Sequence, residues 1–117
     1  MKAREGKVNI KIEKINDNVI VKLEGELNMN YSNMLRETFK KILKDGNIKV
    51  LIDFEKVGFI DSSGIATLLE MFQNLEKVGG RMRLCHVNKR NIGVFEITKV
   101  HKLFGIFENR EDALKGL

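Results

Sequence analysis

The sequence predicts an α/β fold in which a mixed β-sheet of about five strands has about four helices packed against it. Two stretches near the N-terminus alternate apolar and polar side chains, as half-buried strands do. Further along, nearly continuous apolar stretches alternate with segments whose apolar residues recur at helical spacing. The expected order is therefore β-β-α-β-α-β-α-β-α, which is typical of parallel strands joined by crossover helices.

The two alternating stretches are residues 8–14 and 19–23, and turn-forming residues occupy 15–18 between them. This arrangement predicts a β-hairpin. The Glu-Gly-Glu-Leu-Asn segment at 24–28 is expected to carry the chain off the sheet.

From Tyr31 onward the apolar residues recur at helical spacing, which predicts a helix. The Asp-Gly-Asn segment at residues 45–47 is expected to end it. Either Asn28 or Asn30 is suited to cap its start. Residues 48–54 then form a strand whose apolar character is nearly continuous, so both of its faces should be covered. The remaining elements are expected at 63–78 (helix), 81–87 (strand), 89–100 (helix), 103–107 (strand) and 110–117 (helix).

Length and composition limit the kind of protein. The 117 residues are expected to form one domain, spanning residues 1–117. No apolar run is long enough to cross a bilayer and no apolar signal core follows the N-terminus, so a cytoplasmic protein without membrane insertion is expected. The net charge of +5 favours an acidic partner, but the lysines are spread along the chain. Solvated helix faces explain them better than nucleic-acid binding does.

The most informative segment is the strand-to-helix junction Asp61-Ser62-Ser63-Gly64. The first N–H groups of a helix lack partners within the helix and carry the positive end of its dipole, so a phosphate is favoured there. Phosphorylation of either serine would add about −1.5 to −2 charges, which the helix favours and Asp61 opposes. Helix capping alone remains the alternative explanation of these residues. Gly58 and Gly64 together indicate a tight exposed turn, where partners commonly meet open α/β sheets.

An enzyme is the first alternative function. The chain has no Gly-x-Ser-x-Gly elbow, no Gly-x-x-x-x-Gly-Lys-Ser/Thr loop, and no Cys/His cluster with the spacing of a metal site. His86, in a strand predicted to be mostly buried, and His101, after a helix end, are the available imidazoles. Cys85 is expected to be a buried structural thiol. We therefore expect no catalytic residue, no cofactor and no metal.

Several segments match a known family in residue type and spacing. They lie at residues 23–27, 50–54, 57, 59–64, 68–69, 84–87 and 95–107. Through them the chain resembles the STAS domain, and in particular the bacterial anti-sigma factor antagonists. The resemblance covers essentially the whole chain, and it is carried most specifically by Asp-Ser-Ser-Gly together with the Gly-Glu-Leu segment upstream.

The resemblance implies a phosphorylation switch. In such proteins the serine directly after the aspartate, here Ser62, is phosphorylated by an anti-sigma factor that is also an ATP-dependent serine kinase. The unphosphorylated protein binds the anti-sigma factor and frees a sigma factor, phosphorylation ends this binding, and a PP2C-type phosphatase restores it. Asp61, Ser63, Gly64 and Gly58 would support the site and the partner contact.

Position 28 departs from the family pattern, which usually has an aspartate near the phosphorylated serine. Asn28 keeps the shape of that side chain and removes its charge. A second alternative with the same fold is a constitutive STAS scaffold in a signalling or transport assembly, without phosphorylation.

Overall fold

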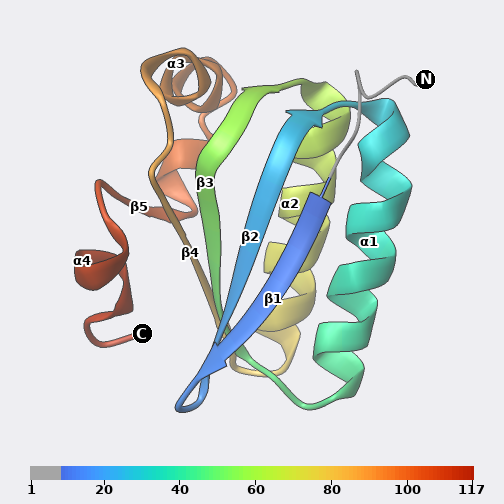
Figure 1. The fold of residues 1–117 in the computed structure, drawn as a ribbon, viewed down its shortest axis with the longest axis vertical. Coiled ribbons are helices and arrows are strands. Elements are labelled where there is room, and N and C mark those ends of the chain that lie inside the picture. Colours follow the sequence, from blue (N-terminus) through green and yellow to red (C-terminus); the bar gives the residue numbers. More distant parts are fainter. Residues whose placement is uncertain (1–8) are drawn as a thin grey trace.

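In the computed structural model, which describes residues 9–117, the first two strands form the predicted hairpin (Figure 1). The turn between them contains Asn16 at a φ of 56°, a left-handed conformation that asparagine tolerates well. Val8, which the sequence places in the first strand, lies outside the described residues.

The element order of the sequence prediction is confirmed. The elements are β1 (Asn9–Ile15), β2 (Asn18–Leu27), α1 (Met29–Lys44), β3 (Lys49–Ile60), α2 (Ser62–Lys77), β4 (Arg81–Cys85), α3 (Lys89–Ile97), the 3₁₀ helix η1 (Val100–Lys102), β5 (Gly105–Phe107) and α4 (Arg110–Leu114).

The sheet has the strand order β1-β2-β3-β4-β5. β1 pairs antiparallel with β2, and all the other neighbouring strands are parallel. This is the mixed five-stranded sheet that the sequence predicts. It follows from one hairpin and from helical connections between the later strands.

β3 lies in the middle of the sheet, and its residues 50–54 are buried, as the apolar character of this segment predicts. Val50 and Ile52 belong to the main core, to which α1 and α2 contribute their apolar sides. Leu51 faces the opposite side, in a smaller core with Cys85 and Ala113 of α4. Figure 1 shows α2 behind the strands and α1 next to it, beside β1.

β2 and β3 both extend further than the sequence predicts, β2 to Leu27 and β3 to Ile60. Residues 24–27 do not leave the sheet, because β2 continues its pairing with β3 as far as Leu27 opposite Ile60. The register shifts twice on the way, between Lys22 and Glu24 and again after Gly25, which has a φ of 120°. Such bulges break the alternation from which a strand is recognised in sequence.

The C-terminal elements are shorter than predicted. β4 ends at Cys85, because His86 has a φ of 58° and leaves the extended conformation. α3 ends at Ile97, and the left-handed Lys99, with a φ of 64°, separates it from η1. α4 ends at Leu114.

The parallel strands end at the same edge of the sheet, and a helix begins directly after β2 and after β3. The N-cap residues are Asn28 for α1 and Asp61 for α2, and Asn88 caps α3 shortly after β4. Three helix N-termini therefore lie at one edge, next to the predicted junction. Among residues 9–117, no helix combines the length and the apolar character needed to cross a membrane.

Candidate functional site

The predicted junction lies where β2 and β3 end side by side. Leu27 pairs with Ile60, and the Asp61 N–H donates to the Leu27 carbonyl over 3.0 Å. Asn28 follows Leu27 directly, and Ser62 follows Ile60 after Asp61, so the structure brings their segments together at one edge of the sheet. The family resemblance implies this proximity, but local sequence patterns do not display it, because Leu27 and Ile60 are far apart in the chain.

Asp61 caps helix α2. Its Oδ1 accepts hydrogen bonds from the Ser63 N–H at 2.9 Å and from the Gly64 N–H at 3.1 Å. Its backbone is extended, as an N-cap requires. The capping explanation is therefore correct for Asp61.

The two serines are not needed for that cap. Ser62 is the first residue of α2 and is exposed, and Ser63 is half-buried. The Ser63 carbonyl accepts a hydrogen bond from the Thr67 hydroxyl at 3.0 Å, within the helix. The exposed hydroxyl of Ser62 thus lies in the first turn of a helix whose cap is already provided.

Gly58 and Gly64 do not form the predicted turn. Gly58 lies inside β3, and Gly64 lies buried in the first turn of α2. A Cβ on Gly64 would come within 2.7 Å of Ile60 Cγ1 and 2.8 Å of the Leu27 carbonyl oxygen. This glycine therefore permits the close approach of α2 to the end of β2, and the expectation of a turn was wrong.

Asn28, rather than Asn30, caps helix α1. Its Oδ1 accepts from the Asn30 N–H at 3.0 Å and from the Tyr31 N–H at 3.2 Å. An amide oxygen makes these hydrogen bonds as well as a carboxylate does. The residue at position 28 therefore satisfies the cap without bringing a negative charge to the site.

Two asparagines that the sequence analysis did not single out hold the end of β3. The buried Asn91 accepts from the Ile60 N–H at 3.1 Å and donates to the Val57 carbonyl at 3.4 Å. Asn88 donates to the carbonyls of Val57 and Gly58. Because both asparagines belong to the start of α3, this helix fixes the backbone that leads to Asp61. A polar residue on the apolar side of a predicted helix was the available signal.

The STAS family model matches residues 9–113. The chain belongs to the STAS domain family. It is 27% identical over 100 residues to the anti-sigma F factor antagonist of Paenibacillus polymyxa, with 85% of this chain and 86% of the relative covered.

Solved structures show the same STAS fold. An anti-sigma factor antagonist from Mycobacterium paratuberculosis is similar with a TM-score of 0.86 at 21% identity, over 94% of this chain and 93% of the other. The anti-sigma factor antagonist SpoIIAA in its unphosphorylated form is similar with a TM-score of 0.80 at 24% identity, over 92% and 94%. The phosphorylated form of SpoIIAA gives a TM-score of 0.73, also at 24% identity and over 92% and 97%.

The histidines of this STAS domain lie outside the junction. His86 is half-buried and follows β4, so its predicted place inside a strand is wrong. Its Nδ1 lies 3.0 Å from Asp53 Oδ1. His101 lies in η1, with Nδ1 3.3 Å from the Phe95 carbonyl oxygen. Within residues 9–117 neither imidazole is hydrogen-bonded to Ser62 or Ser63, so no serine–histidine pair of the kind used in nucleophilic catalysis is formed there.

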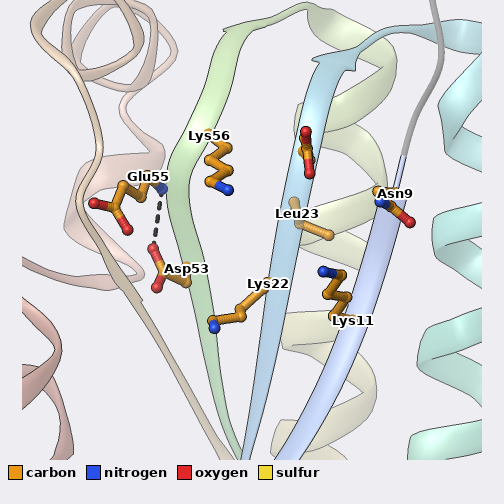
Figure 2. A pocket seen from close by; sticks show the side chains of 8 residues that line it. Asn9, Lys11, Lys22, Leu23, Asp53, Glu55 and Lys56 are labelled. Carbon is orange, nitrogen blue, oxygen red and sulfur yellow. Dashed lines mark hydrogen bonds between the residues drawn. The ribbon is translucent and has the colours of Figure 1, made fainter.

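A hollow of about 230 Å³ lies on the open face of the sheet, away from the helix N-termini (Figure 2). Side chains of both charges line this hollow. They are Lys11, Lys22 and Lys56, from three strands, and Glu24, Asp53 and Glu55. Burial alone would raise the pKa of Asp53, but hydrogen bonds from His86, the Glu55 N–H and Arg110 lower it below the usual value. Asp53 is therefore held as a carboxylate, and the hollow contains none of the predicted switch residues.

Proposed function

We propose that this STAS domain is an anti-sigma factor antagonist regulated by phosphorylation of Ser62. The unphosphorylated protein binds an anti-sigma factor that is also a serine kinase, and phosphorylation ends this binding. A PP2C-type phosphatase removes the phosphate. The relatives named above are called anti-sigma factor antagonists, and one of them has been determined in both phosphorylation states.

The observation that carries the proposal is the division of roles between Asp61 and Ser62. Asp61 satisfies the first N–H groups of α2, while Ser62 stays exposed in the first turn. A kinase can therefore reach the hydroxyl, and a phosphoryl group there costs no capping hydrogen bond. The fold is expected to remain intact while the charge of its surface changes.

The electrostatics of the junction support a reversible switch. The positive ends of the α1 and α2 dipoles favour a phosphate, and Asp61 opposes it. Asn28 caps α1 without adding a second negative charge. The phosphorylated state is thus tolerated by the protein, and the added charge acts on the partner.

The surface next to Ser62 is suited to a protein partner. Met29 is 72% exposed beside Asn28, and Ala66 is exposed one helical turn after Ser62. Phe59 lies below the Arg90 guanidinium, 5.6 Å from the centre of its ring. Exposed apolar side chains around a polar centre are typical of an interaction surface. A dianionic phosphate in the middle of such a surface would have to be desolvated on binding, which disfavours the complex.

The proposal assigns a regulatory binding role rather than an enzymatic one. The serine hydroxyl is the acceptor of a phosphate that the partner kinase transfers from ATP. The kinase accordingly supplies the nucleotide site, and Ser62, Asp61 and Asn28 serve as substrate and docking residues.

The test is phosphorylation by the anti-sigma factor kinase of the same organism with ATP, followed by mass spectrometry of the modified peptide. We expect one phosphate, on Ser62, which is lost in Ser62→Ala. Ser63→Ala is the matched control, because it removes the neighbouring hydroxyl of the same helical turn, and it should still be phosphorylated. Phosphate on another residue would contradict the proposed site.

Partner binding is the second measurement. Ser62→Asp should weaken binding of the kinase by about tenfold or more, since it places a negative charge in the interface, while Ser62→Ala should bind as the wild type does. Full binding by Ser62→Asp together with absent phosphorylation would favour a constitutive scaffold instead. A kinase-independent turnover of esters or nucleotides that disappears in Ser62→Ala would indicate an enzyme.

A further inference from the structure

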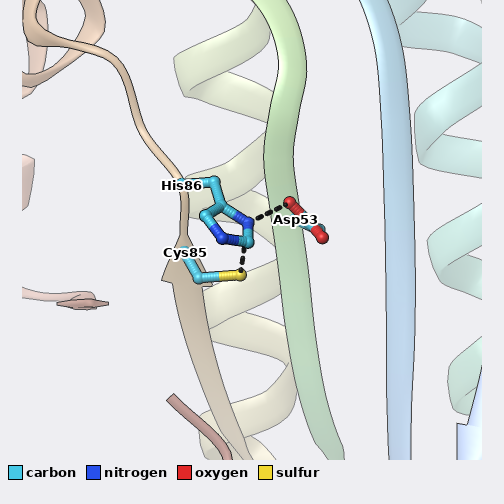
Figure 3. Close-up of side chains that lie close together, drawn as sticks. All are labelled: Asp53, Cys85 and His86. Atoms are coloured by element: carbon cyan, nitrogen blue, oxygen red, sulfur yellow. Dashed lines mark hydrogen bonds and ion pairs between the residues drawn. The ribbon is translucent and has the colours of Figure 1, made fainter. Parts of the chain in front are cut away.

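Three side chains with metal-binding atoms meet in the sheet, one on strand β3 and two at the end of strand β4. Asp53 lies opposite Cys85 in the parallel register, and His86 follows Cys85 directly. His86 Nδ1 lies 3.0 Å from Asp53 Oδ1 and 3.7 Å from Cys85 Sγ (Figure 3). All three ligand atoms are within 4.8 Å of one another.

The backbone of His86 is held in an uncommon conformation that supports this cluster. Its φ of 58° lies in the left-handed region, which non-glycine residues seldom adopt. The His86 N–H donates to the Phe107 carbonyl at 3.3 Å, which helps to hold the turn. In Figure 3 the ring turns toward Asp53 and Cys85. Uncommon backbone conformations of this kind are concentrated at functional sites.

The donor set and its spacing fit a zinc ion. Thiolate, imidazole and carboxylate are the usual zinc ligands, with bonds of about 2.0–2.3 Å and tetrahedral geometry. Such bonds separate neighbouring ligand atoms by about 3.3–3.6 Å. The sulfur–nitrogen separation of 3.7 Å already agrees, and the nitrogen–oxygen separation of 3.0 Å needs a small opening. We propose that Asp53, Cys85 and His86 bind a zinc ion, with a water molecule as the fourth ligand.

The three side chains differ in exposure in a way that would leave one coordination position of the ion open to solvent. Asp53 and Cys85 are buried, with 3% and 0% exposed, whereas the His86 side chain is 30% exposed. The ion can therefore enter on the histidine side and keep a solvent ligand there, while the other two ligands lie in the sheet.

Arg110 acts as an outer partner of the site. Its Nη2 lies 3.2 Å from Asp53 Oδ2, while Oδ1 faces His86 and also accepts the Glu55 N–H at 3.0 Å. A ligating carboxylate is commonly held in place through its second oxygen in this way. Arg110 carries one positive charge, and the Asp53 carboxylate with a Cys85 thiolate carries two negative charges, so the ion remains electrostatically favoured.

Zinc binding has to displace a proton from sulfur. Burial and the nearby Asp53 raise the pKa of the Cys85 thiol to about 12, so the metal-free side chain is the thiol. The ion forms the sulfur–zinc bond as the S–H bond breaks, and the proton passes to solvent. In the metal-free site His86 Nδ1 donates to the Asp53 carboxylate, so this nitrogen also has to lose its proton to solvent. The neutral ring takes up a proton from solvent on Nε2 and presents Nδ1 to the ion.

The test is titration of the chelator-treated protein with Co²⁺, whose bond to thiolate gives a charge-transfer absorption in the near ultraviolet. We expect one Co²⁺ per chain, with this absorption, and displacement of Co²⁺ by Zn²⁺. His86→Asn should lower the affinity by more than about 100-fold, because removal of a direct ligand exceeds the effect of an outer partner. Asparagine is chosen because it tolerates the left-handed backbone.

His101→Asn is the matched control, since it removes the other histidine of the chain and should bind Co²⁺ as the wild type does. Cys85→Ser should remove the charge-transfer absorption, and circular dichroism shows whether this variant is folded. A wild-type titration without the thiolate absorption would overturn the proposal. So would a folded His86→Asn variant that binds Co²⁺ as tightly as the wild type, whatever the outcome for Cys85→Ser.

Discussion

Substitution of Gly64 by alanine tests how closely α2 approaches the sheet at the junction. The added Cβ would lie 2.7 Å from Ile60 Cγ1 and 2.8 Å from the Leu27 carbonyl oxygen. The Leu27 carbonyl cannot retreat freely, because it accepts the Asp61 N–H that fixes the end of β3. Overpacking of this kind costs about 1–3 kcal/mol. The higher helix propensity of alanine returns up to about 1 kcal/mol. We therefore expect a net loss of about 1–2 kcal/mol in the free energy of unfolding.

Gly93→Ala is the matched control. Gly93 also lies within a helix, α3, but a Cβ there would meet no atom within 4 Å. The same substitution should therefore increase the free energy of unfolding by about 0.5–1 kcal/mol, through helix propensity and a less flexible unfolded chain. The two variants should differ by about 2 kcal/mol, with opposite signs relative to the wild type.

Urea unfolding followed by circular dichroism measures both differences from the shift in the transition midpoint. If Gly64→Ala were as stable as the wild type, the close approach of α2 to Leu27 could not be what requires glycine there. A loss of stability in Gly93→Ala as large as in Gly64→Ala would show that helix propensity and local space do not govern these positions.

Two further predictions concern aspartates. Asp61→Ala should reduce the free energy of unfolding by about 1 kcal/mol, because two N–H groups of α2 lose their cap. Asp61→Asn should keep most of the wild-type stability, since an amide oxygen also caps a helix. Urea unfolding of the two variants measures both effects. The lowered pKa of Asp53 means that its contribution to stability is fully present above the unfolded-state pKa of about 4 and is lost as the pH falls toward the folded-state pKa. Asp53→Asn should therefore be less stable than the wild type at pH 7 and lose less on acidification, measured by urea midpoints across the acidic range; parallel pH profiles would contradict this.

The order and type of the elements could be predicted because each follows from a local period. Apolar residues of α1 and α2 recur at helical spacing, and β3 has apolar residues on both faces. The start of α2 was also recognisable, since Asp61 precedes an apolar helical pattern. These features depend on neighbours within a few residues, which a sequence displays directly.

The strand ends could not be predicted in the same way. β2 continues through two register shifts, and its last residues belong to the sheet only because β3 lies beside them. The structural role of a glycine cannot be read from local sequence for a similar reason. Gly64 has the same appearance in sequence as a turn glycine, but its role comes from the Leu27 carbonyl, which approaches from another strand.

Two groups of side chains come together only through contacts between distant segments: the three residues of the proposed metal site, and Asn91 with the end of β3. Cys85 and His86 are adjacent in the chain, but Asp53 joins them only through the register of β3 and β4. No metal spacing is visible in sequence for that reason. Asn91 is buried against the backbone of Val57 and Ile60, and its role appears only once α3 is placed at the end of β3.

The two helix caps at the junction show which features the fold requires and which would concern the proposed switch alone. Asn28 and Asp61 perform the same task, each accepting two N–H groups at the start of a helix, but only Asp61 is charged. Because an amide caps as well as a carboxylate, the fold does not determine the charge at position 28. That charge is free to adjust how strongly a phosphate on Ser62 is opposed. With Asn28 the proposed phosphate would be opposed by the negative charge of the Asp61 cap alone, and the two helix N-termini would favour it. The phosphorylated state should consequently be less strained than in a chain with two acidic caps, and the switch would then depend on what the partner tolerates.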